Sequence, residues 1–216
     1  MNTLQTLSVW ALPILFAVTM HEVAHGWVAR ALGDSTAEEL GRLSLNPIRH
    51  IDPIGTILVP LLLLLVGGFV FGWAKPVPVD MRRLNNPKRD MALVAVAGPL
   101  SNLAMALCWA LIAKVGTLFY GELNWVSLPL IYMGQVGIAI NLILMILNLL
   151  PLPPLDGGRV LAGILPDSLA SGLARIEPFG LFIVLGLLAF GILGKILGPP
   201  YTTLTELITS VFALPF

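Results

Sequence analysis

Two histidines and a glutamate form the most reactive group of side chains in this sequence. His21, Glu22 and His25 make a His-Glu-x-x-His motif, and residues four apart on a helix project from the same face. The two imidazoles can therefore bind one metal ion, typically zinc. Glu22 lies beside that ion, where it can accept a proton from a metal-bound water. This arrangement is typical of zinc hydrolases.

The motif lies in an apolar segment that runs from Pro13 to about Leu32. A helix of that length crosses the hydrocarbon core of a bilayer. Each ionisable group inside a membrane span costs about 2.5–3.5 kcal/mol on insertion scales. Three such groups within five positions indicate a functional site rather than a pair of structural histidines.

The composition is that of an integral membrane protein. The chain has 216 residues, of which 57% are hydrophobic and 11% are charged, against about 25% charged in soluble proteins. Twelve basic residues balance twelve acidic ones, which argues against a nucleic-acid partner. Cys108 is the single cysteine, so neither an intrachain disulfide nor a cysteine metal cluster can form. The N-terminus lacks the basic region and cleavage site of a secretory signal, so the first apolar segment is predicted to be retained.

The predicted fold is an all-α polytopic membrane protein with four to five transmembrane helices. After the first span, apolar segments of sufficient length recur later in the chain, at about 91–113, 129–150 and 179–197, with residues 201–214 too short to assign. Residues 38–53 are predicted to form a short hairpin or an irregular loop. We expect one domain over residues 1–216, with a core at 13–165 and C-terminal helices at 178–214.

Asp156 follows a proline-rich turn at the end of a predicted span. An aspartate in such a turn could be the third zinc ligand, or it could cap the helix that begins near Gly157, and the residues favour neither. His50 could also be a ligand, but Arg49 and Asp52 beside it favour a polar contact at the surface.

The orientation of residues 54–71 decides whether Asp156 can reach the two histidines. If this apolar segment crosses the membrane, Asp156 emerges on the opposite side from the His-Glu-x-x-His motif. If the segment is re-entrant, Asp156 and the motif meet, and of the chain's twelve basic residues only Lys114 and Lys195 lie on the other side. The crossing arrangement divides them five to seven. The positive-inside rule therefore favours the re-entrant arrangement, with the N-terminus outside and the active site toward the cytoplasm.

Three strings in the chain resemble the site-2 protease family of intramembrane zinc metalloproteases. They are the His-Glu-Val-Ala-His motif, Gly-Pro-Leu-Ser-Asn ending at Asn102, and Asn-Leu-Leu-Pro-Leu-Pro-Pro-Leu-Asp-Gly from Asn148. The resemblance runs from about residue 13 to 165. It implies that His21, His25 and Asp156 bind one zinc ion and that Glu22 is the catalytic acid and base. It also implies that Asn102 and Asn148 hold substrate or the developing oxyanion. The chain has no room for a PDZ domain.

The predicted function is hydrolysis of a peptide bond in or near the transmembrane segment of a membrane protein substrate, in a bacterial-type cell membrane. The substrate helix must unwind first, and an extended segment with Trp73, Ala74, Lys75 and Val77 could pair with it as an edge strand. The alternatives are a membrane zinc transporter, a prenyl-protein-type membrane endopeptidase and an inactive membrane scaffold. The sequence leaves the substrate, the regulation and the oligomeric state open.

Overall fold

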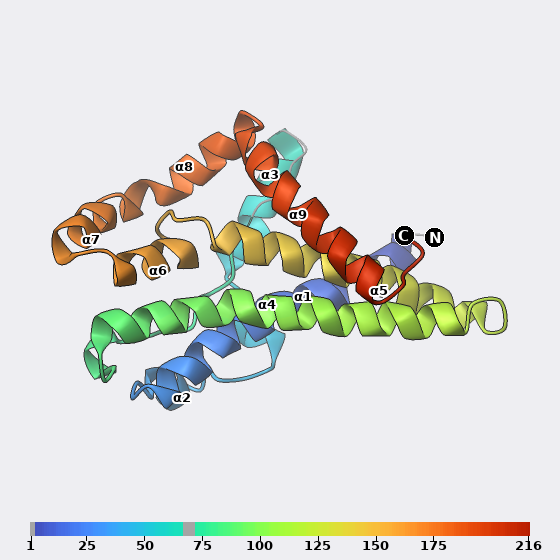
Figure 1. Cartoon of the computed structure of the whole chain (residues 1–216), viewed down its shortest axis with the longest axis horizontal. Coiled ribbons are helices and arrows are strands. Elements are labelled where there is room, and N and C mark those ends of the chain that lie inside the picture. The colour runs from blue at the N-terminus through green and yellow to red at the C-terminus, as the bar shows by residue number, and fades with distance from the viewer. Residues whose placement is uncertain (1–2, 67–71) are drawn as a thin grey trace.

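Every regular element of the described chain is a helix. The computed structural model describes residues 3–66 and 72–216, and within these ranges no strand occurs. Figure 1 shows an elongated molecule in which α4 runs along the longest axis. The all-α class predicted from the sequence is confirmed for this part of the chain.

Three long helices form the core. They are α1 (Thr3–Ala31), α4 (Pro87–Leu118) and α5 (Asn124–Asn148), and each packs against the other two. Glycines let α5 approach α4 closely, since a Cβ on Gly134 would lie 2.4 Å from the Cβ of Ala113 and one on Gly137 would meet the ring of Trp109. Small residues at helix interfaces in membranes allow such close approach. Helix α1 packs against both of these helices.

Shorter elements occupy the connections on either side of α4 and α5. Between α1 and α4 lie α2 (Thr36–Glu39), η1 (Pro47–His50), η2 (Pro53–Leu58), α3 (Val59–Val66) and η3 (Met81–Arg83). After α5 come α6 (Asp156–Ile164), α7 (Asp167–Ala174), α8 (Glu177–Ala189) and α9 (Ile192–Val211). Of these, α6 packs against α4, and α9 packs across α5 (Figure 1).

Within residues 3–66 and 72–216, two helices, α4 and α5, have the length and hydropathy of membrane spans. A third span results if α7 and α8, which meet at an angle of 63°, count as one. The predicted number of four to five spans is therefore not confirmed. The helix that carries the His-Glu-x-x-His motif begins at Thr3, and Pro13, where the span was predicted to start, lies inside it.

The predicted C-terminal span over residues 179–197 is interrupted. Helix α8 ends at Ala189, and Gly191 adopts a left-handed conformation with φ of 67°. Glycine carries no Cβ and takes this conformation readily, so it ends the helix here. Helix α9 then continues through Pro199 and Pro200 to Val211, because prolines are tolerated inside helices that neighbouring structure supports.

The predicted hairpin and edge strand are absent from the described residues. Residues 47–50 form the 3-10 helix η1, which Pro47 begins and the side chain of Asn46 caps. Residues 73–79 are extended but form no strand. Pro76 and Pro78 have no N–H group to donate to a ladder, so the segment is held by single hydrogen bonds instead of by a paired strand.

The two ends of the segment predicted to be re-entrant lie together. The backbone N–H of Trp73 donates to the carbonyl oxygen of Gly55 at 3.1 Å, and the Thr56 hydroxyl donates to the Trp73 carbonyl at 2.9 Å. The chain therefore returns after residue 72 to the place it left at residue 55. Gly67 and Gly68, which interrupt the apolar run, lie outside the described residues.

Candidate metal centre

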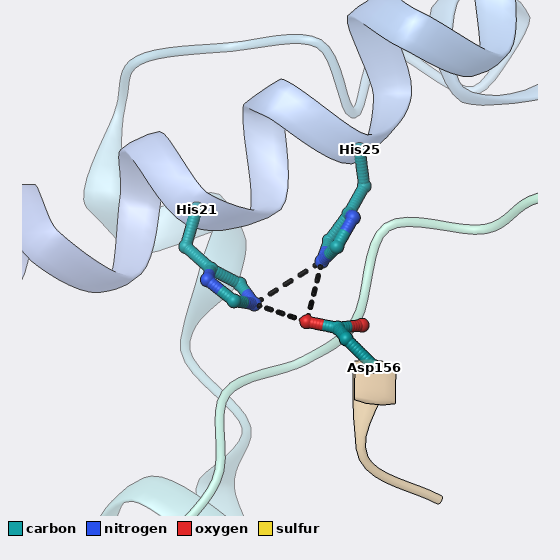
Figure 2. Close-up of side chains that lie close together, drawn as sticks. All are labelled: His21, His25 and Asp156. Atoms are coloured by element: carbon teal, nitrogen blue, oxygen red, sulfur yellow. Dashed lines mark hydrogen bonds and ion pairs between the residues drawn. The ribbon is translucent and has the colours of Figure 1, made fainter. Parts of the chain in front are cut away.

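His21, His25 and Asp156 meet in the structure, although they come from distant parts of the chain. The Nε2 atoms of the two histidines are 3.1 Å apart, and Oδ2 of Asp156 lies 3.2 Å from one and 3.3 Å from the other. Figure 2 shows both imidazoles pointing from α1 toward the carboxylate at the start of α6. All three residues are buried, with exposed fractions of 7–9%. The expected meeting of Asp156 with the His-Glu-x-x-His motif therefore occurs.

The hydrogen bonds on the far side of each ring determine which nitrogen carries the proton. His25 Nδ1 lies 2.7 Å from the carbonyl oxygen of Val94, which can only accept. His21 Nδ1 lies 2.6 Å from Oδ1 of Asn102, whose amide nitrogen donates to the Ala17 carbonyl. Both Nδ1 atoms therefore donate, and a neutral imidazole then presents a lone pair at Nε2.

With both imidazoles neutral, three lone pairs converge at this point. Asp156 Oδ2 is buried and receives no hydrogen bond in the described structure. Two imidazole nitrogens and a carboxylate oxygen within this distance repel one another unless a cation lies among them. For tetrahedral zinc with ligands at about 2.0–2.1 Å, the ligand atoms are about 3.3–3.4 Å apart. The observed separations of 3.1–3.3 Å fit that geometry, and three protein ligands leave one position open.

The position of Asp156 at the start of α6 depends on the glycine that follows it, Gly157. It is the first residue of α6, Leu155 is the N-cap, and no side-chain capping bond forms there. The capping interpretation of Asp156 is therefore wrong. A Cβ on Gly157 would lie 2.3 Å from the carbonyl oxygens of Leu149 and Leu150, so this glycine lets α6 start directly against the end of α5.

Gly98 forms the wall of the site on α4. A Cβ at this position would lie 2.5 Å from Cε1 and Nε2 of His25 and 2.6 Å from Cε1 of His21. The absence of a side chain thus makes room for both imidazoles. The Gly-Pro-Leu-Ser-Asn motif places this glycine and Asn102 one helical turn apart on the same side of α4.

Replacing Gly98 by alanine is expected to weaken zinc binding. The added methyl group must displace the two imidazoles, and overpacking of this kind costs about 1–3 kcal/mol, or about fivefold to 150-fold in affinity. Competition with a chelator measures the affinity. The control is Gly186→Ala in α8, where a Cβ meets nothing within 4 Å. Equal affinities in the two variants would show that Gly98 is not a wall of a metal site.

Asn102 connects the site to the bundle core. It is fully buried, and its amide nitrogen donates to Oδ1 of Asn141 at 2.9 Å as well as to the Ala17 carbonyl. Asn141 in turn donates to the Gly137 carbonyl. With its oxygen on His21, Asn102 has no exposed atom to offer a substrate. Its position is that of a residue that orients a ligand histidine.

We expect Asn102→Ala to reduce zinc affinity about 10- to 100-fold, because hydrogen bonds that orient ligand histidines have effects of this size. Isothermal titration with zinc measures it. Asn148→Ala provides the comparison, since the Asn148 amide nitrogen donates to the carbonyl of Leu144 in its own helix. An Asn102→Ala protein that binds zinc as tightly as the Asn148→Ala protein would contradict the orienting role.

Glu22 lies next to the triad but outside it. It is half-buried, and its Oε2 accepts a hydrogen bond from the backbone N–H of Val77 at 2.8 Å. Among the described residues, the group with metal-ligand spacing consists of His21, His25 and Asp156 alone. Glu22 is thus placed beside the triad and not as a fourth ligand of it.

The remaining candidates lie elsewhere. Asn148 is half-buried near the end of α5 and contacts its own helix. His50 is not part of the triad, and with an exposed fraction of 2% and a 2.8 Å contact from Nε2 to the Ser44 carbonyl it is not a surface contact either. His50 is a buried histidine whose side chain hydrogen-bonds to the backbone six residues earlier.

Most backbone N–H groups of residues 73–77 donate to other parts of the chain. The N–H groups of Trp73, Lys75 and Val77 are all used within the chain, and Pro76 has none. Ala74 has the one N–H group between residues 73 and 78 without a described partner. The predicted pairing of these residues with a substrate strand is therefore not available along the proline-free edge.

Curated proteins of similar sequence are named putative zinc metalloproteases. The chain is 37% identical over 204 residues to "Putative zinc metalloprotease YwhC" of Bacillus subtilis. The aligned region covers 94% of this chain and 90% of that protein. It is 29% identical over 177 residues to "Putative zinc metalloprotease Rip2" of Mycolicibacterium smegmatis. Here the aligned region covers 81% of this chain and 64% of that protein. No protein-family model and no solved structure matches the chain.

Two imidazoles and a carboxylate beside a glutamate are the arrangement expected of a zinc metalloprotease. The identity and coverage of the Bacillus subtilis protein then place the chain within this class. The chain belongs to the site-2 protease-like family of zinc metalloproteases.

Proposed function

We propose that this protein is a zinc-dependent intramembrane endopeptidase that cleaves membrane proteins in or near a transmembrane segment. The observation that carries the proposal is the convergence of three buried acceptor atoms, 3.1–3.3 Å apart, with Glu22 beside them. Both imidazoles contact α4, a helix long and apolar enough to cross a bilayer, and this supports the location of the reaction.

In this proposal, His21, His25 and Asp156 hold the zinc ion and Glu22 moves protons. Zinc, when bound, acts as a Lewis acid that polarises the scissile carbonyl and makes water more acidic. Glu22 accepts a proton from the attacking water and later delivers it to the leaving amine. Asn102 keeps His21 in the tautomer that offers Nε2, and the Val94 carbonyl does the same for His25.

The proposed topology places the triad on the cytoplasmic half. The Lys88 ammonium group, at the start of α4, contacts the Leu165 carbonyl and the Asp167 carboxylate at 2.6 Å each, so the chain after α6 lies at the same end of the bundle as the start of α4. The contact between Gly55 and Trp73 supports a re-entrant segment. Together with the positive-inside rule, these contacts favour an N-terminus outside.

Cysteine labelling tests this topology. In a Cys108→Ala background, a single cysteine at Trp73, which is 37% exposed, is expected to react with an impermeant thiol reagent only from the cytoplasmic side. A cysteine at Glu122, in the α4–α5 connection, is expected to react only from the outside. The opposite pattern would contradict the proposed orientation.

The alternative of a zinc transporter has less support. A conduction path needs further ligands along other helices, and in the described residues one group alone has metal-ligand spacing. The two functions separate in reconstituted vesicles. The proposed protease moves no zinc across the bilayer, whereas a transporter accumulates it.

Comparison of membrane proteomes tests the proposed activity without knowledge of the substrate. Cells that contain the wild-type protein are compared with cells that contain Glu22→Gln. We expect fragments with new ends inside transmembrane segments in the wild-type cells only. Identical fragment sets in the two cell types would contradict the proposal.

A further inference from the structure

Residues 73–80 form an extended segment, here called the strap, that lies against α1 at Glu22. We propose that the strap is a positioning element for Glu22, in which the Val77 N–H group holds one carboxylate oxygen and leaves the other available for proton transfer. This inference rests on the proposed role of Glu22 as the general base.

The contact between the strap and Glu22 involves one oxygen of the carboxylate. The Val77 N–H donates to Oε2 at 2.8 Å, and Oε1 has no hydrogen-bond partner among the described residues. Val77 itself is 7% exposed and packs closely, since a Cβ on Gly26 would lie 3.0 Å from its Cγ1. The backbone donor is therefore pressed against the helix that carries the motif.

The first half of the strap is fixed to the loops before it. The N–H of Trp73 donates to the Gly55 carbonyl at 3.1 Å, and that of Lys75 donates to the His50 carbonyl at 2.9 Å. The Arg42 guanidinium donates to the Lys75 carbonyl at 3.0 Å. Because these partners lie in η2, in η1 and after α2, the strap cannot slide along α1 without breaking several hydrogen bonds.

The second half of the strap is fixed to the turn after α1. The N–H of Asp80 donates to Oδ2 of Asp34 at 2.7 Å, and Asp34 is fully buried. Burial would raise the pKa of Asp34, but hydrogen bonds from Thr36 and Asp80 outweigh it and hold the pKa below its ordinary value. Asp34 is thus ionised at neutral pH. Pro76 and Pro78 limit the freedom of the backbone between the two anchors.

A general base benefits from this restraint. A glutamate side chain has three rotatable bonds, and it is effective only while it lies within hydrogen-bond reach of the proton it removes. A backbone donor that is itself fixed in place restricts the glutamate side chain to one rotamer. A hydrogen bond to a charged group has a net effect equivalent to about 10- to 100-fold in rate.

The experiment compares two substitutions of the same type in the strap. Val77→Pro removes the N–H group that contacts Glu22. Val79→Pro is the control, because the Val79 N–H has no partner among the described residues. Both are assayed with a transmembrane peptide substrate identified by the proteome comparison. We expect Val77→Pro to retain one zinc per chain and an unchanged KM, with kcat about 10- to 100-fold below that of Val79→Pro. Equal kcat values, or loss of zinc from Val77→Pro alone, would overturn the proposal.

Hydrogen exchange decides the question if Val77→Pro does not fold. The exchange rate of the Val77 amide is measured in the wild-type protein and in Glu22→Ala. We expect at least tenfold faster exchange of this amide in Glu22→Ala, with the Lys75 amide unchanged. An unchanged Val77 amide would overturn the inference. This readout needs no activity, so it separates failure of the inference from failure of the proposed function, which would show as a wild-type protein that neither binds zinc nor cleaves.

Discussion

Asp156→Ala is expected to lose its zinc and all proteolytic activity. The substitution removes the one anionic atom of the triad and leaves two imidazole nitrogens 3.1 Å apart, and two neutral ligands do not complete a zinc site. Because a protein-bound zinc contributes to folding free energy, we also expect the thermal stability of the variant to equal that of the zinc-depleted wild-type protein. Elemental analysis of the purified protein measures the zinc content.

Asp167→Ala is the matched control for this prediction. Asp167 follows α6 by a few residues, and its exposed carboxylate pairs with Lys88. We expect this variant to hold about one zinc per chain. Stoichiometric zinc in Asp156→Ala would show that Asp156 is not a ligand, and it would leave the buried carboxylate without an explanation.

Glu22→Gln is expected to keep its zinc and to lose activity by about 10²- to 10⁴-fold. The amide retains the shape of the side chain and can still accept the Val77 hydrogen bond, but it cannot take up a proton, and general acid–base catalysis contributes about 10²- to 10⁴-fold. The initial rate of substrate cleavage at saturating zinc measures the effect.

Glu38→Gln separates the loss of a proton acceptor from a general change of charge. Glu38 is on α2 and pairs with Arg30 at 2.9 Å, in the loop region after the motif helix. Its substitution is expected to leave the rate within about twofold, because exposed pairs contribute little. Glu22→Gln with wild-type rates would exclude Glu22 as the general base.

The parts of the site that the sequence predicts are those with local spacing or a distinctive turn. His21 and His25 share a helix face because they are four apart, and Asp156 stands out because prolines end one helix and glycines permit the next. Their convergence depends on long-range packing, yet charge asymmetry alone pointed to the topology that allows it. Their role as zinc ligands stays a prediction.

Other parts of the site could not be predicted from spacing. Gly98 begins the Gly-Pro-Leu-Ser-Asn string, but its closeness to the two imidazoles depends on how far α1 approaches α4. The hydrogen bond between Asn141 and Asn102 depends on the register between α4 and α5. The strap was interpreted as a strand edge, because the pattern of prolines shows which N–H groups exist and not which side they face.

X-ray absorption spectroscopy at the zinc edge tests the central claim most directly, because it needs no substrate. The purified wild-type protein is expected to hold about one zinc, bound by two imidazole nitrogens and by oxygen at about 2.0–2.1 Å. The imidazole signal should fall by half in His21→Ala if any zinc is retained. A protein that binds no zinc, or a spectrum with sulfur at about 2.3 Å or without imidazole, would contradict the account.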